Sequence, residues 1–200
     1  MDTIVGVDPG LNEVGLAFVD WETGRLVAAD LVRVDHTDRR LKYVDAANQT
    51  VERLVQRNAE GILVRSLWVE RPGIHGVRKK GKAIAGTRTE GGVTRNWTVI
   101  EDLIALSERV QAQASGYPAF VIPRKGADHW TLDSWCGRQS KEKRHMELTL
   151  ATDAIEQNIA RESCGRAQAK LHNVLDAWCI ARWARAGISA DLQEGDHGEL

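Results

Sequence analysis

The stretch "VGVDPGLNEVGLAFVD", residues 5–20, contains two apolar segments on either side of a Gly-containing turn. These segments predict buried strands at 3–8 and 14–20, and the short link between them predicts that the strands are antiparallel. Asp8 stands where the first strand ends. A carboxylate beside a core is costly unless it meets a cation or hydrogen-bond donors. We therefore expect the rest of the chain to supply such a partner.

The pattern beyond this stretch predicts one domain of α/β class over residues 1–186. Further strands are expected at 25–34, 66–70 and 119–123, and helices at 38–58, 98–114, 140–160 and 167–186. The helix predictions depend on apolar residues spaced three and four apart. A meander of three strands, followed by helices and strands in turn, favours a mixed five-stranded sheet flanked by helices.

Composition narrows the class of protein and its location. A hydrophobic fraction of 42% and a net charge of −1 are typical of a globular domain. The three cysteines have no C-x-x-C spacing, which favours a reducing compartment. The chain has neither a signal-peptide pattern nor an apolar run of about 18 residues, so we expect a cytoplasmic protein without a membrane partner. Residues 187–200 carry four acids and no Lys or Arg, and are predicted to form a disordered tail.

Two more carboxylates are candidates to join Asp8. Glu70 ends the strand predicted at 66–70, and Asp176 lies in the last predicted helix. If the first and fourth strands are neighbours, Asp8 and Glu70 lie side by side, and the helix can bring Asp176 across them. Clustered carboxylates repel one another unless a divalent cation lies among them, and oxygen ligands suit Mg²⁺ or Mn²⁺. Two such ions, about 4 Å apart, can activate a water and stabilise the leaving oxygen in phosphodiester cleavage.

A basic segment follows Glu70 directly. Residues 71–97 contain seven Lys or Arg and one acid, so this inserted loop can neutralise phosphates, although a merely solvated insertion has the same composition. Trp130 is a candidate for stacking on unpaired bases. The candidate DNA contacts are Arg71, Arg78, Lys79, Lys80, Lys82, Arg88, Arg95, Trp130 and Arg138.

Three motifs resemble those of the RuvC-type Holliday junction resolvases of the RNase H-like superfamily. They are "VGVDPGLNEVGLAFVD", "LWVERPG" at 67–73 and "HNVLDAWCIARWA" at 172–184. The resemblance implies an RNase H-like fold and a symmetric homodimer. It also implies metal-dependent cleavage of four-way DNA junctions in recombination and repair. By position, it assigns Asp8, Glu70 and Asp176 as metal-binding, catalytic carboxylates.

The resemblance points to two further kinds of site residue. The fourth ligand of the family falls three residues before the last Asp, which here is Asn173, and His172 precedes it on the same broad helix face. Either residue is a candidate second-metal ligand. The run "KEKRH" at 141–145 resembles the family stretch where a lysine acts at the scissile phosphate. Lys143 fits that position best, with Lys141 as the near alternative.

Three other functions share some of these features. A junction-binding protein without cleavage would keep the basic segment, and a plain RNase H would keep the carboxylates without needing that segment. An actin-like ATPase shares the strand, Asp-x-Gly turn and strand at its start, but needs two such domains. A metal-dependent, structure-selective DNA endonuclease is the function that the sequence favours.

Overall fold

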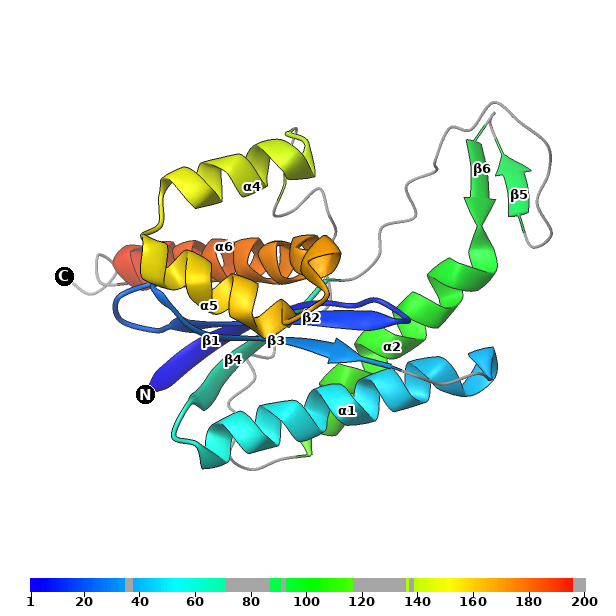
Figure 1. Ribbon diagram of the computed structural model, residues 1–200, viewed down its shortest axis with the longest axis horizontal. Helices are drawn as coiled ribbons and strands as arrows, with labels where there is room; N and C mark the ends of the chain where they lie inside the picture. The colour runs from blue at the N-terminus through cyan, green and yellow to red at the C-terminus, as the bar shows by residue number, and fades with distance from the viewer. Residues whose placement is uncertain (35–37, 71–86, 91–92, 117–135, 137–138, 196–200) are drawn as a thin grey trace.

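A four-stranded sheet lies between two layers of helices (Figure 1). The computed structural model describes residues 1–34, 38–70, 87–90, 93–116, 136 and 139–195, with the backbone alone at 39–40, 87–90, 93–100 and 189–195. The strands are β1 (Asp2–Asp8), β2 (Glu13–Asp20), β3 (Leu26–Arg33) and β4 (Leu63–Val69), in the order β3-β2-β1-β4. β1 pairs antiparallel with β2, and β2 with β3, so the predicted meander is confirmed. β1 also pairs parallel with β4, so the condition that the first and fourth strands are neighbours is met.

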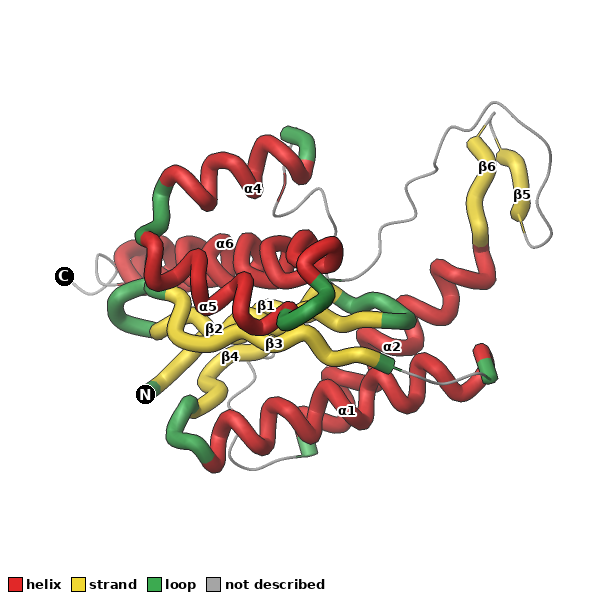
Figure 2. Tube along the Cα trace, in the orientation of Figure 1, coloured by secondary structure: helices red, strands yellow, loops and turns green. Residues whose placement is uncertain are grey.

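Side chains alternate along each strand, so that each strand contributes to two hydrophobic cores, one on each face of the sheet. Val5 and Val7 of β1 face the core beneath helices α1 (Arg39–Ala59) and α2 (Trp97–Ser115). Ile4 faces the opposite core, which the C-terminal helix α6 (Leu171–Gly195) covers. In Figure 2, the yellow strands separate α1 and α2 from the helices of the other layer. Because successive residues point to opposite faces, the even-numbered positions of β1 lie toward α6.

The sheet differs from the predicted one in its number of strands. Within the described residues the main sheet has four strands rather than five, and the strand predicted at 119–123 lies outside them. The basic segment contains a separate hairpin, β5 (Thr87–Glu90) and β6 (Val93–Asn96), at the N-terminal end of α2. This hairpin projects away from the main sheet (Figure 1).

The helix predicted at 140–160 is two helices, α4 (Lys141–Leu150) and α5 (Ala154–Cys164). The helix is interrupted before Asp153, which caps the start of α5. Its side chain accepts hydrogen bonds from the backbone nitrogens of Ile155 and Glu156, at 2.9 and 3.0 Å. The Glu156 side chain accepts in return from the Asp153 backbone nitrogen, at 3.3 Å. This capping box starts a new helix, and the prediction of one helix was wrong.

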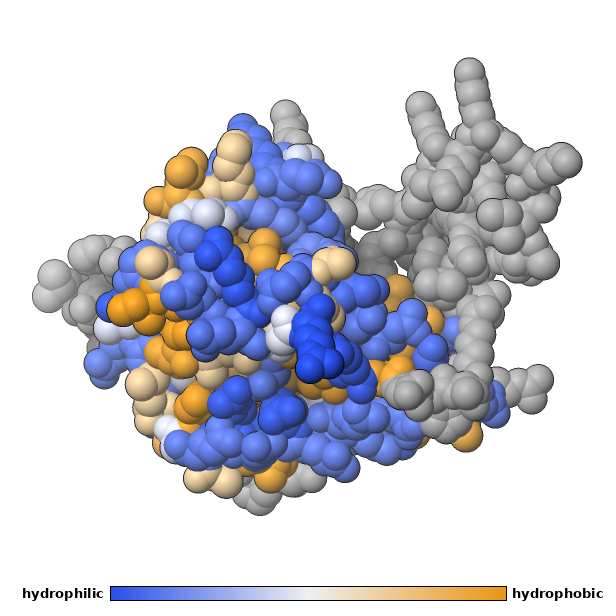
Figure 3. All heavy atoms as spheres, viewed as in Figure 1, coloured by the Kyte–Doolittle hydropathy of each residue, from blue (hydrophilic) through white to orange (hydrophobic). Residues whose placement is uncertain are grey.

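The last helix is longer than predicted. α6 follows a short 3-10 turn at Gln168–Lys170 and continues to Gly195, into the segment that the sequence analysis assigned to a disordered tail. No helix in the described part of the chain is long and apolar enough to cross a membrane. Figure 3 shows a mostly hydrophilic face with separate apolar patches. Large exposed apolar side chains of α4 and α5 include Met146, Leu150 and Ile155.

Candidate active site

Asp8 and Glu70 stand at the ends of two adjacent parallel strands. In the β1–β4 register Val7 lies opposite Val69, and the backbone nitrogen of Glu70 donates to the Val7 carbonyl at 2.9 Å, which extends the ladder by one step. Asp8 and Glu70 follow this pair directly. Since Val7 and Val69 both face the core on the α1 side, the next residue of each strand points to the α6 side. Strand register therefore brings the two carboxylates to one edge and one face.

Two glycines let α6 approach that face closely. A Cβ atom added to Gly6 would lie 2.0 Å from the Ala177 carbonyl oxygen, and one added to Gly15 would lie 2.1 Å from the Asn173 carbonyl oxygen. Any larger residue at either position would clash with the helix backbone. Gly15 is also the β2 partner of Asp8. The close approach thus places the turn of α6 that carries Asp176 over the end of β1.

Asp176 is the most deeply buried carboxylate of the group, with 2% of its surface exposed. Both of its oxygens are engaged by residues of α4. Lys141 Nζ forms an ion pair with Oδ2, and His145 Nε2 lies 2.6 Å from Oδ1. Lys141 and His145 are four residues apart and therefore share one face of the helix.

Lys141 lies in the electric field of all three carboxylates. Burial lowers the pKa of its ammonium group, but the charges of Asp8, Glu70 and Asp176 outweigh burial and raise the pKa above the ordinary value. The ammonium is therefore firmly protonated at neutral pH. One lysine cation thus lies among three carboxylates.

Asp8 shows how crowded this negative charge is. Burial, followed by the charges of Glu70 and Asp176, raises the pKa of the Asp8 carboxyl well above its usual range, and Lys141 only partly offsets them. Within the described part of the chain, the positive charge of Lys141 offsets the charge of these carboxylates only in part. The donors, all hard oxygens, match those that Mg²⁺ and Mn²⁺ prefer. Among the described residues no three His, Cys, Asp or Glu side chains are placed as a group that could hold a metal ion. The fit to a cation therefore rests on the kind of donor atom and on the negative charge, and not on a preformed coordination geometry.

The other predicted site residues differ in whether they reach the carboxylates. Lys143 is exposed, whereas Lys141, the near alternative, reaches the carboxylates. His172 is exposed, and its Nδ1 lies 3.1 Å from the Ala169 carbonyl oxygen. Asn173 is half-buried, and its backbone packs on Gly15. The contact between His172 or Asn173 and a metal stays a prediction.

Sequence reasoning missed His145, which the structure brings to Asp176. The signal was present, because His145 lies one helical turn after Lys141 in the same basic run. Helical spacing relates residues of one helix to one another. It does not identify the partner helix that they face, and this explains the omission.

Most of the predicted DNA contacts lie outside the described residues. Of the candidates, Arg88 and Arg95 belong to the hairpin, where they are directly paired across β5 and β6. Their pairing places both residues on one face of the hairpin. The candidates outside the described residues are Arg71, Arg78, Lys79, Lys80, Lys82, Trp130 and Arg138.

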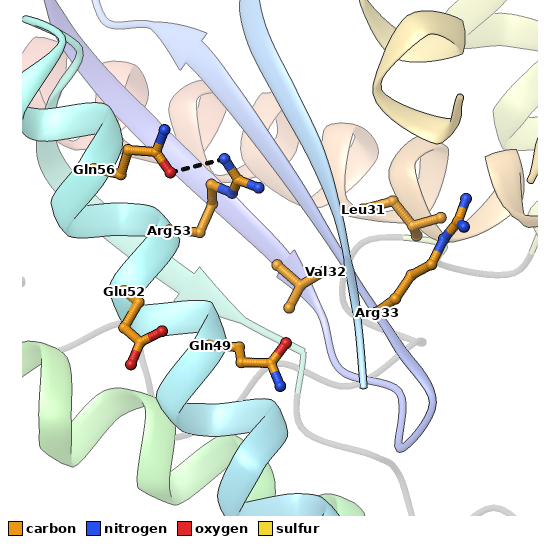
Figure 4. Close-up of a pocket in the computed structure, with 7 residues that line it drawn as sticks. All are labelled: Leu31, Val32, Arg33, Gln49, Glu52, Arg53 and Gln56. Carbon is orange, nitrogen blue, oxygen red and sulfur yellow. Dashed lines mark hydrogen bonds between the residues drawn. The ribbon is translucent and has the colours of Figure 1, made fainter. Parts of the chain in front are cut away.

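A second concave region lies between β3 and α1, apart from the carboxylates (Figure 4). It has a volume of about 290 Å³. Three of its polar side chains already have partners: Arg53 Nη1 donates to Gln56 Oε1 at 2.8 Å, and Arg33 donates to the Cys164 carbonyl oxygen at 2.9 Å. No carboxylate of the active-site group lines it. We therefore assign no chemistry to this groove.

Thiol chemistry is also disfavoured at the carboxylate cluster. Cys179 lies one turn after Asp176, and burial raises the pKa of its thiol to about 12. A thiol with that pKa stays neutral at physiological pH, whereas a nucleophilic cysteine must ionise. The carboxylates and Lys141 therefore remain the candidate reactive groups of this site.

Comparison with solved structures gives two chains of similar structure. One is the Thermus thermophilus RuvC in complex with a Holliday junction substrate, at a TM-score of 0.53 and 14% sequence identity, covering 95% of this chain and 97% of that chain. The other is a Thermus thermophilus RuvC structure, at a TM-score of 0.49 and 14% identity, covering 94% and 96%. No family model and no curated protein matches the sequence. The likeness to the first structure concerns the fold, and it extends over nearly the full length of both chains.

Proposed function

We propose that this chain is a metal-dependent nuclease that cleaves four-way DNA junctions. One observation carries the proposal: Asp8, Glu70 and Asp176, from the ends of two strands and from a helix, all act on the ammonium group of Lys141. Carboxylates that are shielded from water and repel one another cost stability, so their gathering at one sheet edge favours a functional role over a structural one. The RuvC-like fold supports this choice of nuclease class.

The three carboxylates would hold the cation. When bound, one or two Mg²⁺ or Mn²⁺ ions would activate a water and stabilise the leaving oxygen of a phosphodiester. The strands keep Asp8 and Glu70 in fixed register, which lowers the cost of arranging them for the reaction. Lys141 supplies three N–H donors on a flexible stem. Once released from Asp176, its ammonium group is suited to pair with a phosphate oxygen of the DNA.

The four-way junction is the proposed substrate for two reasons. One solved structure with this fold is a RuvC bound to a Holliday junction. The segment 71–97 adds seven basic residues directly after Glu70. Positive charge attached at the mouth of a cleavage site can bind the phosphates of branched DNA. Its contribution would appear in the salt dependence of junction binding, whose log–log slope flattens by about 0.9 for each phosphate contact removed.

A homodimer belongs to the same proposal. Symmetric resolution of a junction requires two like incisions, and two copies related by a twofold axis provide them most simply. Light scattering of the chain, free and bound to a junction, measures this directly. A single copy in both states would exclude the dimer.

Cleavage of three matched substrates tests the function. The full chain is incubated with a four-way junction, an RNA–DNA hybrid and a linear duplex of the same sequence, with Mg²⁺ or Mn²⁺ and with EDTA. We expect metal-dependent, paired nicks in the junction alone. Preferential degradation of the hybrid would indicate a plain RNase H. Tight junction binding without cleavage in either metal would indicate a binding protein.

A further inference from the structure

Asp176 has a partner on each of its carboxylate oxygens, and the two partners differ. Lys141 Nζ forms an ion pair with Oδ2 and interacts electrostatically with Asp8 and Glu70 as well. His145 Nε2 lies 2.6 Å from Oδ1, and within the described residues the His145 ring makes this one hydrogen bond. Since the carboxylate accepts, the Nε2–H group of His145 donates. Oδ2 therefore shares Lys141 with Asp8 and Glu70, whereas Oδ1 is held by His145.

α4 makes further contacts besides these two. Ser140 caps the helix by accepting from the Lys143 backbone nitrogen at 3.3 Å. Arg144 Nε donates to the Cys136 carbonyl oxygen at 3.2 Å. Leu148 is buried in the core that α6 covers. The first of these contacts starts the helix, and the other two attach it to the rest of the fold, so His145 reaches Asp176 from a helix that other residues also hold in place.

His145 is itself well shielded, with 16% of its side chain exposed. A hydrogen bond from a shielded donor to a buried acceptor is not exchanged easily for water, and so it holds the acceptor in one orientation. The exposed His172 of α6, whose ring contacts its own helix backbone, makes no such contact with Asp176 among the described residues. The neighbouring helix, rather than α6, supplies the histidine of this cluster.

We propose that His145 is a positioning residue for Asp176. Its Nε2–H group holds Oδ1, so that Oδ2 stays directed toward Asp8 and Glu70, where the proposed cation would bind. The inference rests on the proposed metal-dependent function and adds a residue to it. Partners that orient a metal ligand in this way commonly change metal affinity about 10–100-fold when they are removed.

Binding of Mn²⁺ alone, without DNA, tests the proposal. The free Mn²⁺ signal in electron paramagnetic resonance gives the Kd for the wild-type chain and for His145→Ala and His145→Gln. We expect His145→Ala to weaken binding about 10-fold. We expect His145→Gln to stay within about threefold of wild type, because its amide nitrogen donates from nearly the same place. Met146→Ala, which changes an exposed residue of the same helix, is the control for folding.

Cleavage at saturating Mn²⁺ separates positioning from direct ligation. A positioning residue is dispensable once the site is filled, so the rate of His145→Ala should return to within about threefold of wild type. An unchanged Kd in His145→Ala would overturn the inference and leave the proposed function intact. Loss of the ¹⁴N modulation of bound Mn²⁺ in His145→Ala would overturn positioning in favour of ligation. A wild-type chain that binds no Mn²⁺ would instead reject the proposed function, and this inference with it.

Discussion

Two clusters of buried charge lie on opposite faces of the same sheet. On the α1 side, Asp30 of β3 accepts hydrogen bonds from Arg57 at 2.8 and 2.9 Å, and the guanidinium lies 6.0 Å from the centre of the Phe18 ring. On the α6 side, Asp176 is held by Lys141 and His145 beside Asp8 and Glu70. Both clusters contain a buried carboxylate with two hydrogen bonds, yet they differ in charge balance.

The charge balance distinguishes a structural cluster from the one for which we propose a function. The hydrogen bond to Asp30 raises the pKa of Arg57, because the carboxylate stabilises the guanidinium cation. In the second cluster the carboxylates repel, and the pKa of Asp8 is raised by burial and by its neighbours. The first cluster ties β3 to α1. The second is kept at a cost in stability, as is typical of binding and catalytic sites.

The largest expected effect is on cleavage. Asp8→Asn removes one negative charge and one ligand from the unbalanced cluster, and should lower the cleavage rate more than about 100-fold, beyond the effect of losing an orienting partner. Junction binding should stay near normal. Gel-based cleavage and binding assays measure both. Asp30→Asn makes the same chemical change in the balanced cluster and should cleave within about threefold of wild type.

The next effect is on folding. Arg57→Met leaves Asp30 buried without its main cation and should lower the free energy of unfolding by about 2–3 kcal/mol, less than the ~3–5 kcal/mol typical of a fully buried pair. Urea denaturation measures the change. Adding Asp30→Asn should recover part of the loss, because the stranded charge is then removed. A loss below about 0.5 kcal/mol would mean that the balanced cluster does not stabilise the fold.

A smaller effect is expected on metal affinity. Lys141→Met removes the positive charge that competes for the carboxylates, so Mn²⁺ should bind about fivefold more tightly, the equivalent of about 1 kcal/mol. Cleavage should still fall, because the phosphate loses a donor. Calorimetric titration of Mn²⁺ gives the affinity. Weaker binding in this variant would show that Lys141 supports the site rather than occupying it.

The sequence predicted the sheet well where local rules decide the structure. Strands around 3–8 and 14–20 follow from apolar runs joined by a short turn, and the structure has them at Asp2–Asp8 and Glu13–Asp20. The break between α4 and α5 was missed although the capping box of Asp153 and Glu156 was readable. Local sequence signals, when all of them are used, are thus sufficient to predict the ends of these strands and helices.

The candidate site was harder to predict because it depends on contacts between elements. The carboxylates could be proposed from their places at strand ends and in the last helix. The approach of α6 through Gly6 and Gly15 required the strand register, and the approach of α4 depends on tertiary packing. For this reason neither the contact of Lys141 with Asp176 nor the presence of His145 followed from spacing alone.

Thermal melting in EDTA and in Mn²⁺ tests the central claim most directly, namely that the α6-side cluster is unbalanced because it binds a cation. At neutral pH in EDTA, Asp8→Asn should be more stable than wild type by about 1 kcal/mol, since one repulsive carboxylate is gone. Mn²⁺ should raise the Tm of the wild type and leave that of Asp8→Asn nearly unchanged. The difference in stability between the two chains should therefore become smaller or change sign. An Asp8→Asn variant that is less stable in EDTA, or that gains as much from Mn²⁺ as the wild type, would contradict the account.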